Sequence, residues 1–423
     1  MSPKESIYQR LPFYYGWLVF LATFLTLMFM FGLRYSIGVF FVPIQKEFGW
    51  SSAVTAGSLT VFFWVYGVFA LFISKLYKSI GIRKIILLGG IFLGLGGIIA
   101  SFTTELWQLY LSWGVLAAIG SSILYTVPNM VLGRFFLKNR GKAVGWSSIG
   151  ISVGQAVIIP FSAWIVANYG WRYSFLLLGT FVIIGVALPG YLIFRDSPES
   201  IGLKKDGGKY ISDEKEQSEK IEKSSYKVLT ISEILKTRTF RYILVSYFFQ
   251  VGGTVSLLTF VVPHIIQLGI DPLLAASAIG VIGIMSAIGS FVFGFISDWI
   301  GRKYTIAIAL TGMATAMLVS TIIPPNIIAL YAWVTLYGLT YGGAPEQYAS
   351  IVQDYYGTGG DVALYGWVMF FGALGGGLFP LISGYLFDIT GNYYASLIFL
   401  GVGVVGGLAS MLLVKSPKKI ETV

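Results

Sequence analysis

Long apolar runs follow one another along almost the whole chain, each separated from the next by a short polar segment. A helix needs about 20 apolar residues to cross a bilayer, and twelve runs reach about that length. They lie near residues 13–42, 51–76, 85–103, 108–136, 142–168, 173–194, 240–268, 273–297, 304–323, 327–356, 362–387 and 393–414. Because 56% of the 423 residues are hydrophobic and only 11% are charged, too few polar groups remain to cover soluble domains. The sequence therefore predicts an all-α membrane protein with twelve transmembrane helices in the lipid bilayer.

The basic residues are concentrated in alternate loops. If both termini are cytoplasmic, nearly all of the 29 Lys and Arg residues face the cytoplasm, and Lys46 and Arg172 face outward. This asymmetry predicts a multi-pass protein of the plasma membrane with cytoplasmic N- and C-termini. The net charge of +10 does not indicate nucleic-acid binding, because the basic residues do not cluster on one soluble face.

Two residue counts argue against an enzyme. The chain has no Cys, which excludes disulfides, thiolate metal sites and cysteine nucleophiles. Its single His, His264, lies in an apolar run without the partner motif of a hydrolytic triad. We expect no catalytic residue, metal or cofactor.

The two halves of the chain share landmarks at a nearly constant offset, which indicates an internal repeat. The pairs are Gly81 with Gly301, Pro160 with Pro380, Gly145 with Gly366, and Gly170 with Gly391. Six spans is an even number, so both units enter the membrane from the same face and are related by a pseudo-two-fold axis along its normal. We expect six-helix bundles at residues 1–195 and 237–423, a solvated cytoplasmic linker at 196–236, and a site between the bundles.

The segment GFISDWIGRK, residues 294–303, resembles the inter-helix signature of the major facilitator superfamily, G-x-x-x-D-x-x-G-R-K. This resemblance implies a transporter in which two bundles rock about a midplane site. It also implies that Asp298, Gly301 and Arg302 form a latch, with Asp298 pairing to a basic residue or helix N-terminus of the neighbouring bundle. The first-half copy, KSIGIRK at 78–84, keeps Arg83 but has Lys78 where the Asp should be, so any latch there must differ.

Further segments resemble the monocarboxylate and oxalate/formate porter branch of that superfamily. They are YYGWLVF at 14–20, YSIGVFF at 35–41, RGKAVGWSSIGISVG at 140–154 and NYGWRYSF at 168–175. The positions where these relatives carry a substrate-binding Arg, its acidic partner and a Lys are here Ser290, Ser286 and Gly372. The usual cationic anchors are therefore missing, which argues against oxalate as the substrate.

Arg34 is the preferred anchor for an anion. It precedes Tyr35, which stands where monocarboxylate porters place a Lys, and it lies on a helix that lines the central cavity in the superfamily. A guanidinium can hold a carboxylate through two parallel hydrogen bonds. Alternatively, the Arg34 side chain could extend to the outer interface and have no part in binding.

Glu346, in YGGAPEQY at 341–348, is the candidate for proton coupling. An intramembrane carboxyl group can take up and release a proton as access alternates. Alternatively, Glu346 is a structural partner for a helix end or a Tyr hydroxyl, or it pairs with Arg34 as a gate in the empty state.

Other polar residues complete the predicted site. His264 could relay protons or face the cavity mouth, although an interfacial histidine is the simpler interpretation. Tyr125, Asn129 and Gln250 can offer neutral hydrogen bonds to a small substrate. We expect a monomeric transporter that moves a small organic anion, most simply a monocarboxylate such as lactate or pyruvate, together with a proton. Uncoupled exchange or uniport, and a non-transporting sensor of the same fold, are the alternatives.

Overall fold

The computed structural model describes residues 12–136, 140–208, 231–323, 326–356 and 361–416, and every element in these ranges is helical. The first half contains α1 (Gly16–Tyr35), α2 (Ile37–Phe48), α3 (Ser52–Ile80), α4 (Ile82–Ala100), α5 (Leu106–Leu109), η2 (Tyr110–Ala117), α6 (Ala118–Phe135), α7 (Arg140–Val153), η3 (Gly154–Ile158), α8 (Ile159–Tyr169), α9 (Trp171–Val182), η4 (Ile183–Ala187) and α10 (Leu188–Ile193). The short turns η5 (Glu199–Ile201) and η6 (Lys205–Gly208) follow. The second half contains α12 (Ile231–Lys236), α13 (Arg238–Gln267), α14 (Pro272–Ile300), α15 (Arg302–Val319), α16 (Ile327–Gly342), α17 (Pro345–Tyr356), α18 (Asp361–Thr390) and α19 (Tyr394–Leu413).

These helices form twelve membrane crossings, six in each half, as predicted. Eleven segments of the described chain are long and apolar enough to span a bilayer by composition alone. The remaining crossing is α15, which has only 18 residues and begins with Arg302 and Lys303. It packs against α16 and α19 of the same half. Its apolar content is lower because Arg302 and Lys303 stand at its start.

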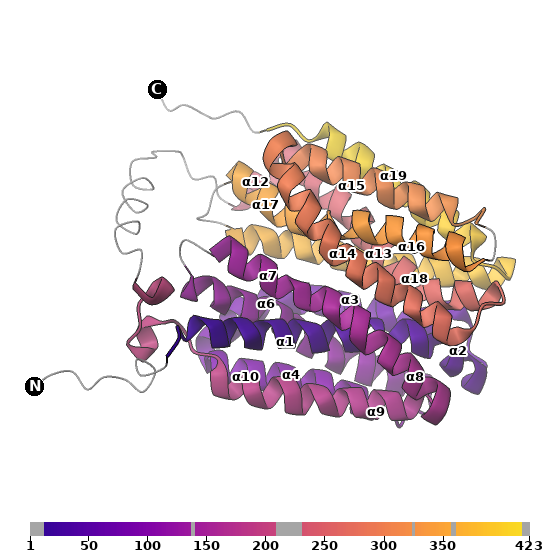
Figure 1. Cartoon of the computed structure of the whole chain (residues 1–423), viewed down its shortest axis with the longest axis horizontal. Helices are drawn as coiled ribbons and strands as arrows, with labels where there is room; N and C mark the ends of the chain where they lie inside the picture. The colour runs from indigo at the N-terminus through magenta and orange to yellow at the C-terminus, as the bar shows by residue number, and fades with distance from the viewer. Residues whose placement is uncertain (1–11, 137–139, 209–230, 324–325, 357–360, 417–423) are drawn as a thin grey trace, which may run out of the picture.

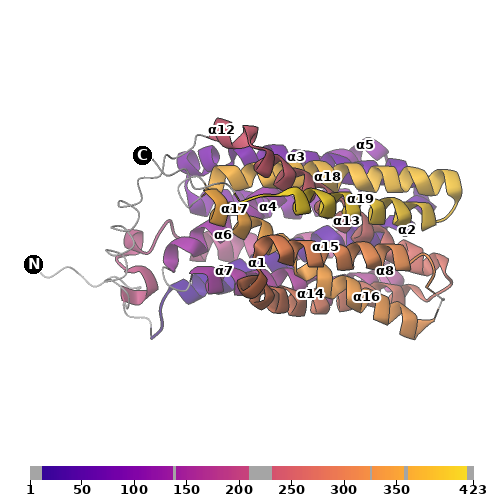
Figure 2. The ribbon, with the colours of Figure 1, turned by 90° about the horizontal axis from the view of Figure 1, so that it is seen from above.

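The two halves lie side by side, with their helices running in one common direction (Figures 1 and 2). Helix α1 begins and α19 ends at the same end of the molecule, which we call the terminal end; the opposite end, where α2 and α8 lie, we call the far end (Figure 1). The charge pattern of the sequence predicts that the terminal end is cytoplasmic.

The repeat inferred from the sequence is visible in the backbone. Gly81 and Gly301 end α3 and α14 with φ of 79° and 85°, and Gly170 and Gly391 have φ of 87° and 71° after α8 and α18. Only glycine adopts such positive φ values without strain, which explains why these landmarks are shared between the halves.

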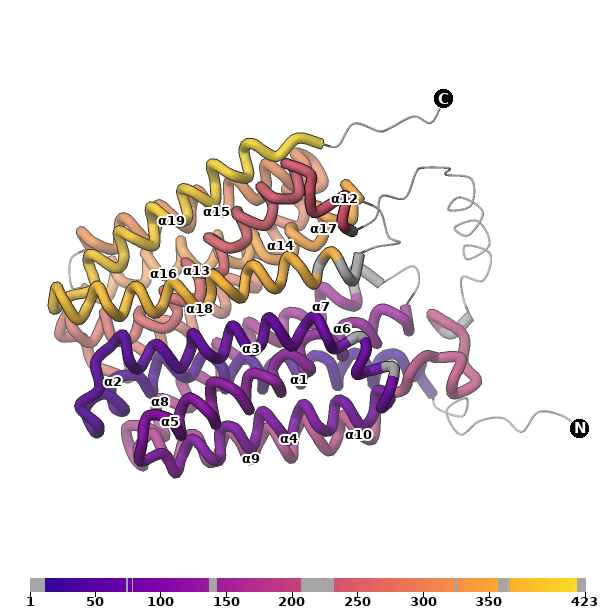
Figure 3. Tube along the Cα trace, turned by 180° about the vertical axis from the view of Figure 1, so that it is seen from behind, coloured from indigo at the N-terminus to yellow at the C-terminus, as the bar shows by residue number. Residues whose placement is uncertain are grey.

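The halves meet along two lines of close helix packing. Helix α3 packs on α18 (Figure 3). At this contact Gly376 approaches the Phe63 ring. Helix α14 packs on α7, η3 and α8, where the Ser152 and Ser286 hydroxyls are 2.9 Å apart. In lipid the hydrophobic effect does not drive helices together, so their association depends on close packing. Small residues allow the helix backbones to approach closely enough for this packing.

A third contact closes the far end of the interface. Helix α2 packs on α13, with Gly38 close to the Leu258 carbonyl and the Phe41 and Phe260 rings 5.1 Å apart. The described parts of α6 and α17, on the terminal side, belong to no comparable contact between the halves.

Two of the predicted cavity helices are broken near mid-length. The first crossing changes from α1 to α2 at Ser36, whose hydroxyl donates to the Gly32 carbonyl at 2.7 Å. The tenth changes from α16 to α17 at Gly343 and Ala344. Broken helices line ligand sites in many transporters, and here Arg34 and Glu346 each lie within three residues of a break.

Candidate functional site

Arg34 lies at the end of α1 and is buried, with 6% of its surface exposed. Its guanidinium carbon lies 4.4 Å from the centre of the Phe63 ring and 5.0 Å from that of Tyr66. The rings of Phe31, Phe62 and Tyr35 complete the surroundings at 5.3, 5.4 and 5.6 Å. The side chain therefore does not extend to the interface, which was the alternative interpretation of this residue.

Within the described residues, the Arg34 cation has no carboxylate partner. None of the ion pairs includes it, and its Nε atom is buried without a hydrogen-bond acceptor. The faces of aromatic rings attract a cation but carry no net charge, so they offset its burial only in part. The alternative in which Arg34 pairs with Glu346 is not seen among the ion pairs of the described residues.

Tyrosine hydroxyls connect Arg34 to both halves of the molecule. Tyr66 of α3 contacts the Arg34 guanidinium and lies within electrostatic range of Tyr125 of α6, whose ring packs on Phe31 at 5.9 Å. Tyr125, a predicted ligand, is also within electrostatic range of the buried Tyr247 of α13. Tyr66 and Tyr247 were not predicted; their signal is a Tyr in an otherwise apolar stretch of a span.

Tyr35, the other predicted residue of α1, lies near two tyrosines of α16. It lies within electrostatic range of Tyr337 and Tyr341, whose rings stack with centroids 6.0 Å apart. All three tyrosines are at most 8% exposed. The cluster of Arg34, Tyr35, Tyr66, Tyr125, Tyr247, Tyr337 and Tyr341 therefore spans the interface between the halves, and we call it the central cluster.

Two glutamines border the central cluster. Gln250 of α13, which was predicted, donates through Nε2 to the Thr254 hydroxyl at 3.3 Å. Gln155 of η3, which was not predicted, donates through Nε2 to the Tyr341 hydroxyl at 3.4 Å. The Oε1 atom of each is buried without a partner. A buried amide in an apolar span was the signal for Gln155 that could have been used.

Asn129, also a predicted ligand, uses part of its hydrogen-bonding capacity within its own helix. Its Nδ2 donates to the Tyr125 carbonyl at 2.8 Å, which leaves Oδ1 as its one free polar atom. Asn129 therefore fixes the backbone beneath Tyr125 and offers at most an acceptor to a ligand.

Glu346 lies in the first turn of α17 and forms no side-chain hydrogen bond or ion pair with the described residues. It keeps exposed surface although the surrounding protein desolvates its carboxyl group. Its side chain is exposed in the structure, in contrast to the buried Arg34.

His264 is enclosed at the far end of α13, with 3% of its surface exposed. Rings of Trp333, Tyr393 and Tyr394 surround it at centroid distances of 6.4, 6.0 and 6.0 Å. It therefore packs as a core aromatic residue and does not face a cavity mouth.

The signature loop pairs within its own half. The Asp298 carboxylate lies 3.2 Å from Arg302, whose Nε lies 3.5 Å from the Asp354 carboxylate of α17. Arg302 also contacts Ser297 and Gln347, so it ties the α14–α15 junction at Gly301 to α17. The side chains of Arg140 and Lys142, the basic residues at the start of α7 in the other bundle, lie outside the described part of the structure, so the pairing of Asp298 across the bundles stays a prediction.

The corresponding loop of the first half uses a different contact. Arg83 donates to the Tyr191 carbonyl of α10 at 2.9 Å and lies over the Tyr191 ring. The predicted role of the Lys78 side chain lies outside the described part of the structure.

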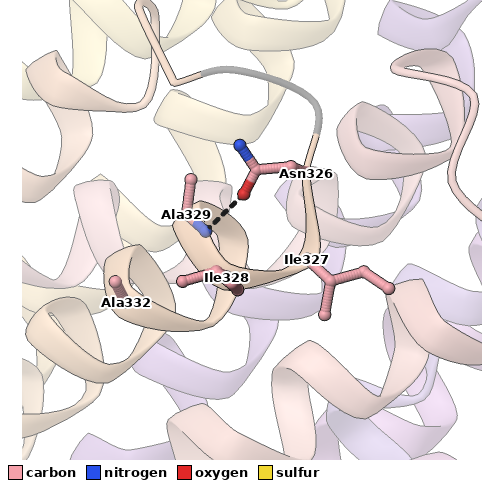
Figure 4. A pocket seen from close by; sticks show the side chains of 5 residues that line it. All are labelled: Asn326, Ile327, Ile328, Ala329 and Ala332. Atoms are coloured by element: carbon pink, nitrogen blue, oxygen red, sulfur yellow. Dashed lines mark hydrogen bonds between the residues drawn. The ribbon is translucent and has the colours of Figure 1, made fainter.

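A surface depression at the start of α16 lies apart from these residues (Figure 4). Asn326, Ile327, Ile328, Ala329 and Ala332 line it. The Asn326 side chain is used to cap the helix, because its Oδ1 accepts from the Ala329 N–H at 2.8 Å. The depression has no charged residue in its lining and is not a candidate site.

Comparison with known proteins agrees with this architecture. Residues 19–380 match the Major Facilitator Superfamily. Monocarboxylate transporter 13 of Rattus norvegicus is 28% identical over 93% of this chain and 87% of its own, and monocarboxylate transporter 12 of Xenopus laevis is 26% identical over 95% and 89%. A bacterial homolog of the human lysosomal transporter Spinster, solved in an inward-facing and occupied conformation, has the same fold, with a TM-score of 0.72 at 17% identity and coverage of 95% of this chain and 97% of its own.

The relatives are transporters and not enzymes, as the residue counts predicted. They also agree with the branch suggested by the sequence motifs. This chain belongs to the Major Facilitator Superfamily and is a multi-pass membrane transporter similar to the monocarboxylate transporters.

Proposed function

We propose that this protein moves a small organic anion, most simply a monocarboxylate, together with a proton by alternating access. The observation that carries this proposal is the buried Arg34 cation, which has no carboxylate partner among the described residues and lies in a cluster contributed by both halves. A buried charge needs a counter-charge, and a bound carboxylate would supply it.

The anion binds at the guanidinium fork. The unpartnered Nε of Arg34 and a terminal nitrogen can donate two parallel hydrogen bonds to one carboxylate. The surrounding rings hold the fork in place and exclude water, and the Tyr66 hydroxyl restrains it from one side. Small apolar parts of the substrate would pack against the same rings.

Glu346 carries the proton. With a carboxylate on Arg34 and a proton on Glu346, both intramembrane charges are neutralised before the bundles reorient, which lowers the cost of moving them through a low-dielectric region. His264 has no role in this proposal, because it is enclosed by rings at the far end.

Alternating access uses the contacts between the halves. The contact of α2 with α13 at the far end must open. The interfaces of α3 with α18 and of α8 with α14 are retained, and the bundles rotate relative to each other about them. We propose bundles at 1–195 and 237–423, a plasma-membrane location with cytoplasmic termini, and function as a monomer, since the central cluster is complete within one chain.

Uncoupled exchange or uniport is the second candidate. It is favoured by one observation: among the described residues, no hydrogen bond or ion pair joins the Glu346 side chain to the central cluster. In that case Glu346 would be structural and the anion would move down its own gradient.

Reconstitution into liposomes tests the proposal. Purified protein is incorporated with a pH-sensitive dye inside, and lactate, pyruvate or acetate is added outside as an inward gradient. We expect carboxylate uptake with simultaneous internal acidification that a protonophore abolishes. Uptake without proton movement would establish the second candidate, and absence of flux for every carboxylate would refute anion transport.

A further inference from the structure

Gln155 and Gln250 are buried amides from opposite halves, each with one end unpartnered. Gln155 has 0% and Gln250 has 1% of its surface exposed, and each uses Nε2 for one long hydrogen bond. The other end of each amide, Oε1, has no partner among the described residues. Buried polar atoms are nearly always satisfied in folded proteins, so these two are candidates for contact with a ligand.

The local fold holds Gln155 at the interface. It lies in η3, a π-helical turn between α7 and α8, and such turns often occur at functional sites. Gly283 of α14 faces it, and a Cβ at that position would lie 2.8 Å from Gln155 Cβ. The glycine therefore lets α14 approach closely enough to hold this side chain against the second half.

The two amides are linked to Arg34 through one row of side chains. Gln155 contacts Tyr341, and Tyr341 stacks on Tyr337. Tyr337 lies beside Thr254, the partner of Gln250. Tyr35, next to Arg34 in the chain, lies within electrostatic range of both Tyr337 and Tyr341.

The chemistry of this row differs from that at Arg34. It is neutral, and it leaves free the two amide oxygens and the Tyr337 hydroxyl, which forms no hydrogen bond of normal geometry. A hydroxyl group can both donate and accept, so it satisfies such groups, whereas a methylene group leaves them unpaired. A site built to bind a hydroxyl group discriminates strongly against the analogue that lacks it.

We propose that Gln155 and Gln250 form a second subsite that binds a hydroxyl group on the carbon chain of the substrate, so that the protein selects hydroxylated monocarboxylates over unsubstituted ones. This inference rests on the proposed function, since Arg34 holds the carboxylate end. It assigns recognition of the far end of the substrate to two residues from different halves, so that the hydroxyl group is held only when the halves are together.

Uptake into liposomes of paired acids tests this inference. The pairs are propionate with lactate, butyrate with 3-hydroxybutyrate, and butyrate with 4-hydroxybutyrate, which place the hydroxyl group at increasing distance from the carboxylate. In the wild type we expect the hydroxylated member of at least one pair to have a KM about tenfold lower. In Gln155→Met and Gln250→Met, which keep side-chain length, we expect that ratio to fall toward one while uptake of the unsubstituted acid persists.

The ratio within one preparation is independent of how much protein is folded. Ser162→Ala, which removes a buried hydroxyl that contacts Ser174, is the matched control and should keep the wild-type ratio. A wild type without hydroxyl preference in any pair, or variants that retain the preference, would overturn the subsite and leave anion transport intact. Failure of the wild type to move any of the five acids would instead overturn the proposed function, and the subsite with it.

Discussion

The Asp388 carboxylate of α18 accepts hydrogen bonds from the Ser52 N–H at 2.7 Å and, through its second oxygen, from the Ala53 N–H at 2.8 Å. These are the first two N–H groups of α3, so a side chain of the second half caps a helix of the first half at the far end. The positive end of the helix dipole strengthens this contact. The equivalent helix of the second half, α14, is capped by its own Asp271.

Asp388→Asn should favour opening of the far end. The amide keeps the size of the side chain but loses the charge and one acceptor, which costs about 1 kcal/mol for a cap, or about a fivefold change in equilibrium. Because the chain has no Cys, Thr259→Cys at the α2–α13 contact gives a single reporter. We expect its maleimide labelling in detergent to accelerate about fivefold.

Asp271→Asn is the control for that experiment, since it removes a cap of the same chemistry that does not bridge the halves. It should leave the labelling rate unchanged. Equal acceleration in both variants would mean that the Asp388 contact has no part in closing the far end.

Gly289→Ala should lower stability, because a Cβ there would collide with the backbone carbonyl of Leu339 where α14 crosses α16. Overpacking of this kind costs about 1–3 kcal/mol. Gly294→Ala in the same helix has open space at the Cβ and should keep or slightly raise stability. Thermal unfolding in detergent compares the two; an equal effect on both would contradict the close packing of α14 on α16.

Glu346→Gln should separate substrate movement from proton movement. The amide is permanently uncharged, so the reoriented cavity no longer carries a proton, whereas Arg34 still binds the anion. We expect downhill carboxylate exchange to persist and acidification of the liposome interior to be lost. Glu105→Gln, at the exposed start of α5, is the control and should keep both. Intact proton coupling in Glu346→Gln would remove this residue from the mechanism.

Much of the fold was predictable because the bilayer imposes simple constraints on a sequence. Span length predicted the crossings, and the paired glycines at 81 and 301 predicted the repeat, since their positive φ values leave little choice of residue. The run at 304–323, predicted as a span, corresponds to α15, whose two basic residues lie at its start. The change from α16 to α17 falls just before Pro345, where two Gly and a Pro in the sequence indicate a loosened helix. The change at Ser36 was not predicted, because it depends on packing between helices.

The site was less predictable for a physical reason. An intramembrane charge is conspicuous in an apolar sequence, and so Arg34 could be identified directly. Tyr66, Tyr247 and Gln155 could not, because neutral polar residues also serve helix packing, and only their positions in space distinguish the two uses. Asp298 contacts Arg302 of its own loop, and its predicted pairing across the bundles stays a prediction.

Initial uptake of labelled lactate into liposomes by Arg34→Gln and Arg34→Lys tests most directly whether Arg34 is the anion anchor. A lost charged hydrogen bond costs about 1.5–3 kcal/mol, so kcat/KM should fall about tenfold or more in Arg34→Gln. Arg34→Lys keeps the charge without the fork and should fall between that variant and the wild type. Uptake at the wild-type rate by a correctly folded Arg34→Gln protein would contradict the account.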